Sequence, residues 1–176
     1  MLIKTIFAGF GGQGVLSMGL NLAQAAMLEG KNVTYLPSYG AEVRGGAANC
    51  TVAVSDEEIA SPVASSPDFV VALNQPSLVK FQNQVHAGGL LFINSSIVEA
   101  KIARGDIDVV GVPASAIAEE MKSPKSANMV MLGAFIKKNN LVSLTSLMEG
   151  LKSTLKQKKK LIDINIKALE AGYDLF

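Results

Sequence analysis

Short apolar runs alternate along the chain with longer segments of helical periodicity. The runs are rich in β-compatible residues and have the length of buried strands, and they lie at residues 2–8, 68–73, 90–94 and 108–112. Helical segments follow the first two runs: residues 15–29 come after a glycine cluster, and residues 74–77 begin another helix with a proline near its first turn. This alternation predicts a mostly parallel sheet with right-handed crossovers and helices on both faces.

A glycine-punctuated segment, residues 38–49, separates two further strand-like runs at 32–36 and 50–55. Because proline lacks a backbone N–H, we expect the first of these strands to end before Pro37. The segment is long for a bare connection, and such loops are usually functional or disordered. Since it lies between ordered elements, we expect it to be a functional loop.

The last third of the chain has a helical pattern. Beyond Ser126, apolar residues recur at helical spacing in three groups: Met129, Leu132 and Ile136; then Leu144, Leu147 and Leu151; then Ile162, Ile166, Leu169 and Tyr173. With 176 residues, 49% of them hydrophobic, the chain can bury one sizeable core. We therefore expect residues 1–176 to form a single Rossmann-like α/β domain with a helical C-terminal third.

Composition narrows the chemistry that the chain can carry. Its single cysteine, Cys50, excludes an internal disulfide and cannot by itself hold a zinc ion or an iron–sulfur cluster. The formal net charge of +1 argues against a dedicated nucleic-acid binder. Residues 5–28 carry no charge, but glycines and polar residues interrupt them too often for a membrane-spanning helix. The N-terminus lacks the pattern of a secretion signal, so we expect a cytoplasmic protein.

Residues 9–14, with the sequence GFGGQG, have the spacing G-x-G-x-x-G directly after a strand and at the start of a helix. Such glycines let the backbone turn tightly, approach a phosphate and present the free N–H groups of a helix start. We therefore expect an anion at this loop. The structural alternative is that the glycines only allow a tight turn and close packing of helix on strand.

Two common nucleotide-binding motifs do not fit the glycine loop. A dinucleotide site needs an acidic residue about 20 residues past the motif, at the end of the second strand. Here that strand ends in Tyr35-Leu36-Pro37-Ser38, and the first acid afterwards is Glu42. A P-loop is excluded because no lysine followed by serine or threonine comes after the glycines.

Four stretches of the sequence together point to one family. They are FAGFGGQGV at 7–15, PSYGAEVRGGAANC at 37–50, VALNQP at 71–76 and NMVMLGA at 128–134. In this combination the chain resembles the γ subunit, or γ domain, of 2-oxoacid:ferredoxin oxidoreductases, most of all that of the 2-oxoglutarate:acceptor enzymes. The resemblance covers nearly the whole chain and is far more specific than the glycine motif alone.

The resemblance implies a multi-subunit enzyme in which this chain is not catalytic alone. Such enzymes decarboxylate a 2-oxoacid on thiamine diphosphate with Mg²⁺, pass electrons through [4Fe-4S] clusters to ferredoxin or flavodoxin, and transfer the acyl group to coenzyme A. The thiamine and cluster sites are implied on companion α, β and δ-type subunits. We expect this chain alone to bind none of these cofactors, and we expect no nucleic-acid or membrane partner.

The resemblance also assigns roles to residues. The glycine loop, with Gly9, Gly11, Gly12, Gln13 and Gly14, is expected to face a phosphate-bearing group, with that of coenzyme A as the first candidate. Tyr39, Glu42, Arg44 and Asn74 are expected to contact companion subunits or ligand. The guanidinium of Arg44 can grip a carboxylate or phosphate in two places. Its alternative role is an internal salt bridge with Glu42 that stiffens the loop.

Other conspicuous residues have ordinary interpretations. His86, the sole histidine, lies in a context typical of a helix end or loop, and we expect it to be structural or solvated. We expect Cys50 to be a buried, inert thiol and not a redox or acyl-carrying one. The basic cluster of Lys156, Lys158, Lys159 and Lys160 could contact phosphates or an acidic electron carrier, but such clusters are usually solvated helix faces.

No residue in the sequence indicates which 2-oxoacid is the substrate. The resemblance makes 2-oxoglutarate the first candidate, with pyruvate or branched-chain 2-oxoacids next and indolepyruvate as a neighbouring alternative. A rival of another class is a free-standing nucleotide- or coenzyme-binding module that shares only the glycine loop. That rival predicts a stable monomer that binds its ligand alone, whereas a subunit should expose an apolar surface near residues 38–49.

Overall fold

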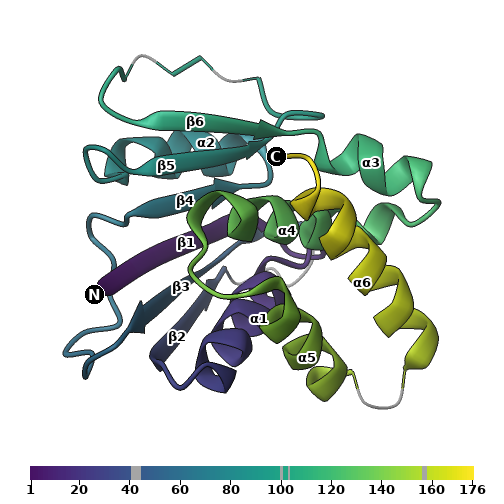
Figure 1. The fold of residues 1–176 in the computed structure, drawn as a ribbon. Helices are drawn as coiled ribbons and strands as arrows, with labels where there is room; N and C mark the ends of the chain where they lie inside the picture. The colour runs from purple at the N-terminus through teal and green to yellow at the C-terminus, as the bar shows by residue number, and fades with distance from the viewer. Residues whose placement is uncertain (41–44, 100, 103, 156–157) are drawn as a thin grey trace.

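The computed structural model describes residues 1–40, 45–99, 101–102, 104–155 and 158–176 (Figure 1). Within this part of the chain, six strands form one sheet in the order β2-β3-β1-β4-β5-β6. The strands are β1 (Leu2–Phe10), β2 (Asn32–Tyr39), β3 (Ala47–Ser55), β4 (Phe69–Ala72), β5 (Leu90–Asn94) and β6 (Asp108–Val112). The helices are α1 (Val15–Leu28), α2 (Gln75–Phe81), α3 (Ala114–Glu120), α4 (Ala127–Asn139), α5 (Leu144–Thr154) and α6 (Lys159–Tyr173), with 3-10 turns at Gln82–Gln84 and Pro124–Ser126.

Five of these strands run in one direction and β3 runs in the other. β1, β4, β5 and β6 are parallel neighbours, whereas β3 pairs antiparallel with both β1 and β2. The prediction of a mostly parallel α/β sheet is therefore confirmed. A Rossmann dinucleotide domain places the second strand beside the first. Here β3 lies between β1 and β2, so the carboxyl end of β2 is not adjacent to the strand that leads into the glycine loop.

The β2–β3 hairpin corrects the prediction of a long loop. β2 continues through Pro37 to Tyr39, and β3 begins at Ala47, so only residues 40–46 connect the strands. The prediction that the strand ends before Pro37 is wrong because β2 is an edge strand, where a proline need not remove a ladder hydrogen bond. In the paired register, Tyr39 lies opposite Ala48.

Helices cover both faces of the sheet, as predicted. On one face, α1, α4, α5 and α6 bury a core that includes Phe7, Phe92 and Phe135 (Figure 1). The ring of Phe135 packs edge-on against Phe7 and Phe92, with centroids 5.5 and 5.2 Å apart. On the other face, α2 covers a second cluster that includes Ile6 and Leu78.

The C-terminal third is helical, as predicted. α4 is buried over nearly its whole length and packs against α6. A helix that is buried all round needs apolar side chains on every side, which residues 129–136 supply. Among the residues that the structure describes, no helix combines the length and the apolar character needed to cross a membrane.

Candidate functional site

The glycine loop forms a tight turn at the carboxyl end of β1. β1 ends at Phe10, and Gly14 is the N-cap of α1 with a φ of 75°. This left-handed conformation strains any residue that carries a Cβ. A Cβ at Gly14 would also collide with the side chain of Asn128, which comes from the start of α4. Gly14 therefore serves both the turn and the close approach of α4.

Gly9, the first glycine of the motif, lies within β1 and not in the turn. A Cβ built there would be 2.7 Å from Gln13 Oε1 and 2.7 Å from Val15 Cγ2. The turn can fold back over the strand only because this position has no side chain. Packing thus explains Gly9, as the structural alternative predicted, whereas a Cβ added at Gly12 would meet nothing within 4 Å.

The N-terminus of α1 presents free hydrogen-bonding capacity beside these glycines. Its first turn holds no acidic residue, and no side chain among the described residues caps it. The backbone of Gly11 is already paired, because its N–H donates to Gly46 O at 2.8 Å and its carbonyl accepts from Gly45 N at 3.3 Å. An uncapped helix start carries partial positive charge and N–H groups that suit an anion.

A cleft of about 580 Å³ opens next to this helix start. Its lining residues are Phe10, Gly11, Gly12, Gly14, Val15, Leu16, Ser17, Tyr39 and Ala48. Phe10, Leu16 and Tyr39 make its walls largely apolar, and Tyr39 is 66% exposed. The structure therefore brings the predicted residue Tyr39 to the glycine loop. The cleft combines backbone donors at one end with apolar walls, which suits a phosphate attached to a bulkier organic group.

Gln13 and Asn74 are brought together on the other side of the loop. Gln13 Oε1 accepts from Phe10 N at 2.7 Å and from Asn74 Nδ2 at 2.9 Å. Asn74 Oδ1 accepts from Ser77 N at 2.9 Å and so caps α2. Asn74 is only 4% exposed. These two carboxamides hold the loop against the end of β4, which is a positioning role.

Asn128 is a site residue that the sequence alone did not single out. Its Nδ2 donates to Gly14 O at 3.2 Å, across 114 positions of sequence. A polar residue at the start of an otherwise apolar helix was the available signal. Asn128 also lines a second, smaller cavity of about 220 Å³ at the carboxyl ends of the parallel strands, together with Gln13, Asn94, Ser115 and Lys125.

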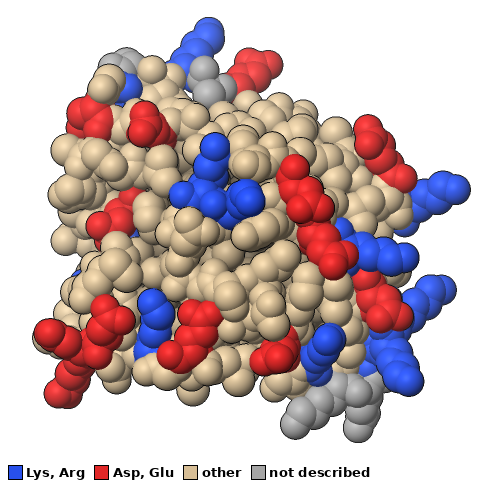
Figure 2. All heavy atoms as spheres, viewed as in Figure 1, with Lys and Arg blue, Asp and Glu red and all other residues tan. Residues whose placement is uncertain are grey.

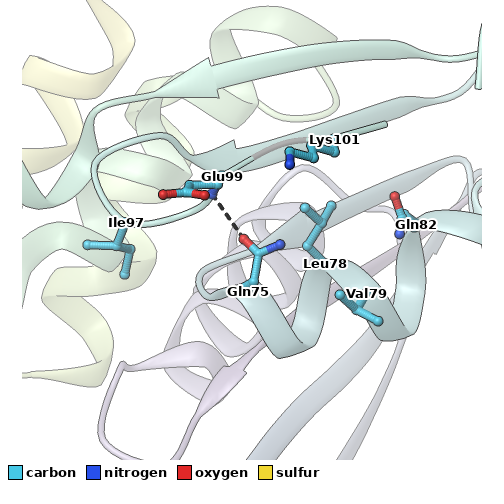
Figure 3. Close-up of a pocket in the computed structure, with 7 residues that line it drawn as sticks. All are labelled: Gln75, Leu78, Val79, Gln82, Ile97, Glu99 and Lys101. Carbon is cyan, nitrogen blue, oxygen red and sulfur yellow. Dashed lines mark hydrogen bonds between the residues drawn. The ribbon is translucent and has the colours of Figure 1, made fainter. Parts of the chain in front are cut away.

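A further cavity of about 480 Å³ lies on the α2 face, away from the glycine loop. It is lined by Gln75, Leu78, Val79, Gln82, Ile97, Glu99 and Lys101 (Figure 3). Gln75 Oε1 accepts from Glu99 N at 2.9 Å and ties α2 to the segment after β5. None of the described residues among those predicted to bind ligand or partner lines this cavity.

The other candidates from the sequence lie apart from the cleft or outside the described residues. Glu42 and Arg44 lie outside the described residues. His86 is exposed in the turn before β5, as predicted. Cys50 is fully buried beneath α1, and burial raises the pKa of its thiol to about 12. The expectation of a buried thiol is confirmed, and a thiolate is strongly disfavoured there.

Charge and metal ligands are dispersed over the described surface. Figure 2 shows acidic and basic side chains interspersed on the face formed by the C-terminal helices. Lys158, Lys159 and Lys160 are exposed at the start of α6, whereas Lys156 lies outside the described residues. Within the described ranges, no three or more His, Cys, Asp or Glu side chains gather as a metal site would require. The described residues therefore hold no group of His and Cys ligands of the kind that an iron–sulfur cluster requires.

Comparison with known proteins identifies relatives over nearly the whole chain. Residues 4–175 match the family described as pyruvate ferredoxin/flavodoxin oxidoreductase. The chain is 45% identical over 175 residues to ketoisovalerate oxidoreductase subunit VorA of Methanothermobacter thermautotrophicus, a match that covers 97% of this chain and 35% of VorA. It is 34% identical over 171 residues to 2-oxoglutarate synthase subunit KorC of Methanocaldococcus jannaschii, covering 96% of this chain and 90% of KorC.

A solved structure has the same fold. The 2-oxoglutarate:ferredoxin oxidoreductase of Magnetococcus marinus, with 2-oxoglutarate, coenzyme A and succinyl-CoA bound, matches with a TM-score of 0.91 at 27% identity. The match covers 99% of this chain and 31% of that chain. This chain thus spans about a third of VorA and of the Magnetococcus chain but most of KorC. Identity is higher to VorA than to KorC, so a specific likeness to 2-oxoglutarate enzymes is not established. The match over residues 4–175 shows that this chain belongs to the pyruvate ferredoxin/flavodoxin oxidoreductase family.

Proposed function

We propose that this chain is the γ-type subunit of a 2-oxoacid:ferredoxin or flavodoxin oxidoreductase and holds a phosphate-bearing part of coenzyme A in the glycine-loop cleft. The observation that supports the ligand is the uncapped start of α1, which opens onto a cleft with apolar walls. Decarboxylation and electron transfer take place on thiamine diphosphate and iron–sulfur clusters of companion subunits. This chain contributes no catalytic residue of its own.

Each wall of the cleft has a distinct task in this proposal. The N–H groups at the start of α1 and the hydroxyl of Ser17 bind phosphate oxygens. Phe10, Leu16 and Tyr39 contact the apolar parts of the coenzyme. Gln13 and Asn74 lie on the other side of the loop, and their hydrogen bond fixes the shape of the turn. Together they orient the coenzyme toward the companion subunits.

For Glu42 and Arg44 we keep the role expected from the sequence, which is contact with a companion subunit or with ligand. Glu42 and Arg44 follow Tyr39 by a few residues, and Tyr39 borders the cleft. We propose that Arg44 contacts the phosphate or a companion subunit. Tyr39 is exposed enough to do the same, whereas the buried Asn74 acts only through Gln13.

The substrate has two candidates, each favoured by one observation. The higher identity to VorA favours a branched-chain 2-oxoacid such as ketoisovalerate. The 34% identity to KorC over 171 residues supports 2-oxoglutarate as the other candidate. The test is the rate of coenzyme A-dependent dye reduction by the purified complex. Rates measured with ketoisovalerate, 2-oxoglutarate, pyruvate and indolepyruvate rank the candidate substrates.

The coenzyme site is tested by Ser17→Glu, assembled into the complex. A carboxylate in the first turn of a helix is favourable for folding, but it repels a phosphate bound at the same place. We expect the KM for coenzyme A to rise about tenfold or more while the KM for the 2-oxoacid stays unchanged. Ser17→Gln, similar in size and neutral, is the control. An unchanged KM for coenzyme A in Ser17→Glu places the phosphate elsewhere.

A further inference from the structure

The cavity of about 220 Å³ beside the glycine loop lies at the place where ligands bind in open α/β sheets. β1 and β4 are parallel neighbours, but the chain leaves β1 toward the face covered by α1 and leaves β4 toward the face covered by α2. Ligands of doubly wound sheets bind in the crevice outside the carboxyl ends of two such strands. The cavity occupies this crevice, because its lining includes Gly12 and Gln13 after β1 and Leu73 after β4.

The charge of this cavity favours an anion. Lys125 is exposed, and it is the one charged side chain among the described residues that line the cavity. The other polar side chains in the described lining are neutral: Gln13, Asn94, Ser115 and Asn128. No carboxylate in this described lining offsets the ammonium group, so a negatively charged ligand is favoured there.

The neutral side chains still have hydrogens to donate. Ser115 Oγ accepts from Asn94 Nδ2 at 2.8 Å, which leaves the hydroxyl hydrogen to bind another acceptor. A carboxamide nitrogen carries two hydrogens, and Asn128 Nδ2 donates one of them to Gly14 O. Gln13 Nε2 likewise donates one to a backbone carbonyl at 3.4 Å. The lining therefore offers a cation and several donors, which suits the three acceptor oxygens of a phosphate.

The cavity adjoins the cleft that we propose for coenzyme A. Gly12 lines both the cleft and the cavity. A Cβ added to Gly12 would meet nothing within 4 Å, so the two spaces meet at a position that has no side chain and is not crowded. A ligand with one phosphate group at the start of α1 can therefore extend past Gly12 and place a second one beside Lys125.

We propose that this cavity binds a phosphate monoester, the 3′-phosphate of coenzyme A, while the start of α1 binds the pyrophosphate. Coenzyme A carries both groups on one ribose. A pyrophosphate suits the backbone N–H groups of a helix start. A terminal phosphate is a dianion with three free oxygens, which a lysine, a hydroxyl and carboxamides can surround. This inference rests on the proposed function and assigns its second phosphate contact to Lys125.

The test measures binding of coenzyme A and of 3′-dephospho-coenzyme A to the complex assembled with each variant. Lys125→Gln removes the charge from the cavity. Lys122→Gln is the matched control, because Lys122 is also exposed, lies three residues away and is not among the residues that line the cavity. Equilibrium dialysis without a 2-oxoacid gives each Kd in the absence of turnover. Thermal unfolding confirms that the variants fold.

Wild type and Lys122→Gln should bind coenzyme A about tenfold or more tightly than the dephospho form, because the dephospho form lacks the charge-assisted contact. Lys125→Gln should bind the two forms with Kd values within about threefold of each other, and its affinity for the dephospho form should equal that of wild type. Equal weakening of both forms by Lys125→Gln would assign Lys125 to the pyrophosphate and overturn the proposal.

Unchanged affinity of Lys125→Gln for both forms would also overturn it. The failure of this inference is separable from that of the proposed function through Ser17→Glu. If Ser17→Glu still raises the KM for coenzyme A, the proposed function stands without the second phosphate contact. If neither Ser17→Glu nor Lys125→Gln affects coenzyme A, both are overturned.

Discussion

Gln13 Oε1 accepts a hydrogen bond from Asn74 Nδ2 at 2.9 Å and thereby joins the glycine loop to the start of α2. The same oxygen accepts from Phe10 N at 2.7 Å. Two donors that come from separate elements thus share one acceptor, and the buried Asn74 depends on it. The bond between Gln13 and Asn74 fixes the shape of the turn on the side of α2. The side of the turn that borders the cleft is left free for a ligand.

Removing this acceptor should loosen the loop. Gln13→Ala leaves Phe10 N and Asn74 Nδ2 without their partner, and we expect the free energy of unfolding to fall by about 1–3 kcal/mol. Chemical denaturation measures the change, and exposed Asn83→Ala is the control. In the assembled complex, Gln13→Ala should raise the KM for coenzyme A more than that for the 2-oxoacid. Equal stability of Gln13→Ala and Asn83→Ala would show that the shared acceptor does not hold the turn.

Gly14 and Gly88 have similar φ angles, so a comparison of the two separates the cost of backbone strain from the cost of a steric contact. Gly14 has a φ of 75° and lies against Asn128, whereas Gly88 has a φ of 83° and a Cβ added to it would meet nothing within 4 Å. Gly88→Ala should cost about 1 kcal/mol of unfolding free energy from strain alone. Gly14→Ala should cost about 2–4 kcal/mol, because Asn128 must also move. Equal losses in denaturant titrations would contradict the tight contact between the glycine loop and α4.

A carboxylate links the end of α1 to the start of α5 and makes stability depend on pH. Burial alone would raise the pKa of Glu29, but hydrogen bonds from Ser143 and Ser146 hold it below its usual value. Ser143 N donates to Glu29 Oε1 at 2.7 Å. Because the folded-state pKa is lowered, the stabilisation is complete above the unfolded-state pKa of about 4.3 and is lost as pH falls through the folded-state pKa.

Glu29→Gln should therefore be less stable than wild type at neutral pH, and the difference should shrink as the solution is acidified through about pH 4. Urea titrations at a series of pH values measure it. Glu149→Gln, which removes an exposed carboxylate elsewhere on the surface, is the matched control. A wild-type advantage over Glu29→Gln that grows on acidification would reverse the sign and contradict the role of the Ser143 contact.

The thiol of Cys50 should be unreactive in the folded chain. It is fully buried, its pKa is raised to about 12 by burial, and its Sγ lies 3.6 Å from Val15 O. A thiol reagent at pH 8 should label it only at the rate of global unfolding, with immediate labelling in denaturant. Labelling of the native protein at the rate of a free thiol would revive a redox or acyl-carrying role for this residue.

The sequence predicted the local elements well and the long-range pairings less well. Residues 90–94 and 108–112 form strands with the predicted bounds, because compact apolar runs between turn signals leave few alternatives. The insertion of β3 between β1 and β2 was not predicted. An alternating run such as residues 50–55 can pair with a neighbouring strand in a parallel or an antiparallel direction. Tertiary contacts determine which of the two pairings forms.

The same limit applies to the site. The glycine loop was identified from its own motif and Tyr39 from the family resemblance, and the structure brings them to one cleft. Asn128 was missed as a partner of Gly14 because 114 residues of sequence separate them. The end of β2 was predicted wrongly at Pro37, because the effect of a proline on strand pairing depends on whether the strand lies at the edge of the sheet.

The most direct test of the central claim is anaerobic affinity purification of this chain from its native cells, followed by assay of coenzyme A-dependent dye reduction with several 2-oxoacids. A γ-type subunit predicts co-purification of thiamine- and cluster-bearing partners, together with activity that requires both coenzyme A and a 2-oxoacid. Recovery of the chain alone, as a monomer that binds a nucleotide or coenzyme tightly without partners, would contradict the account and identify a free-standing binding module.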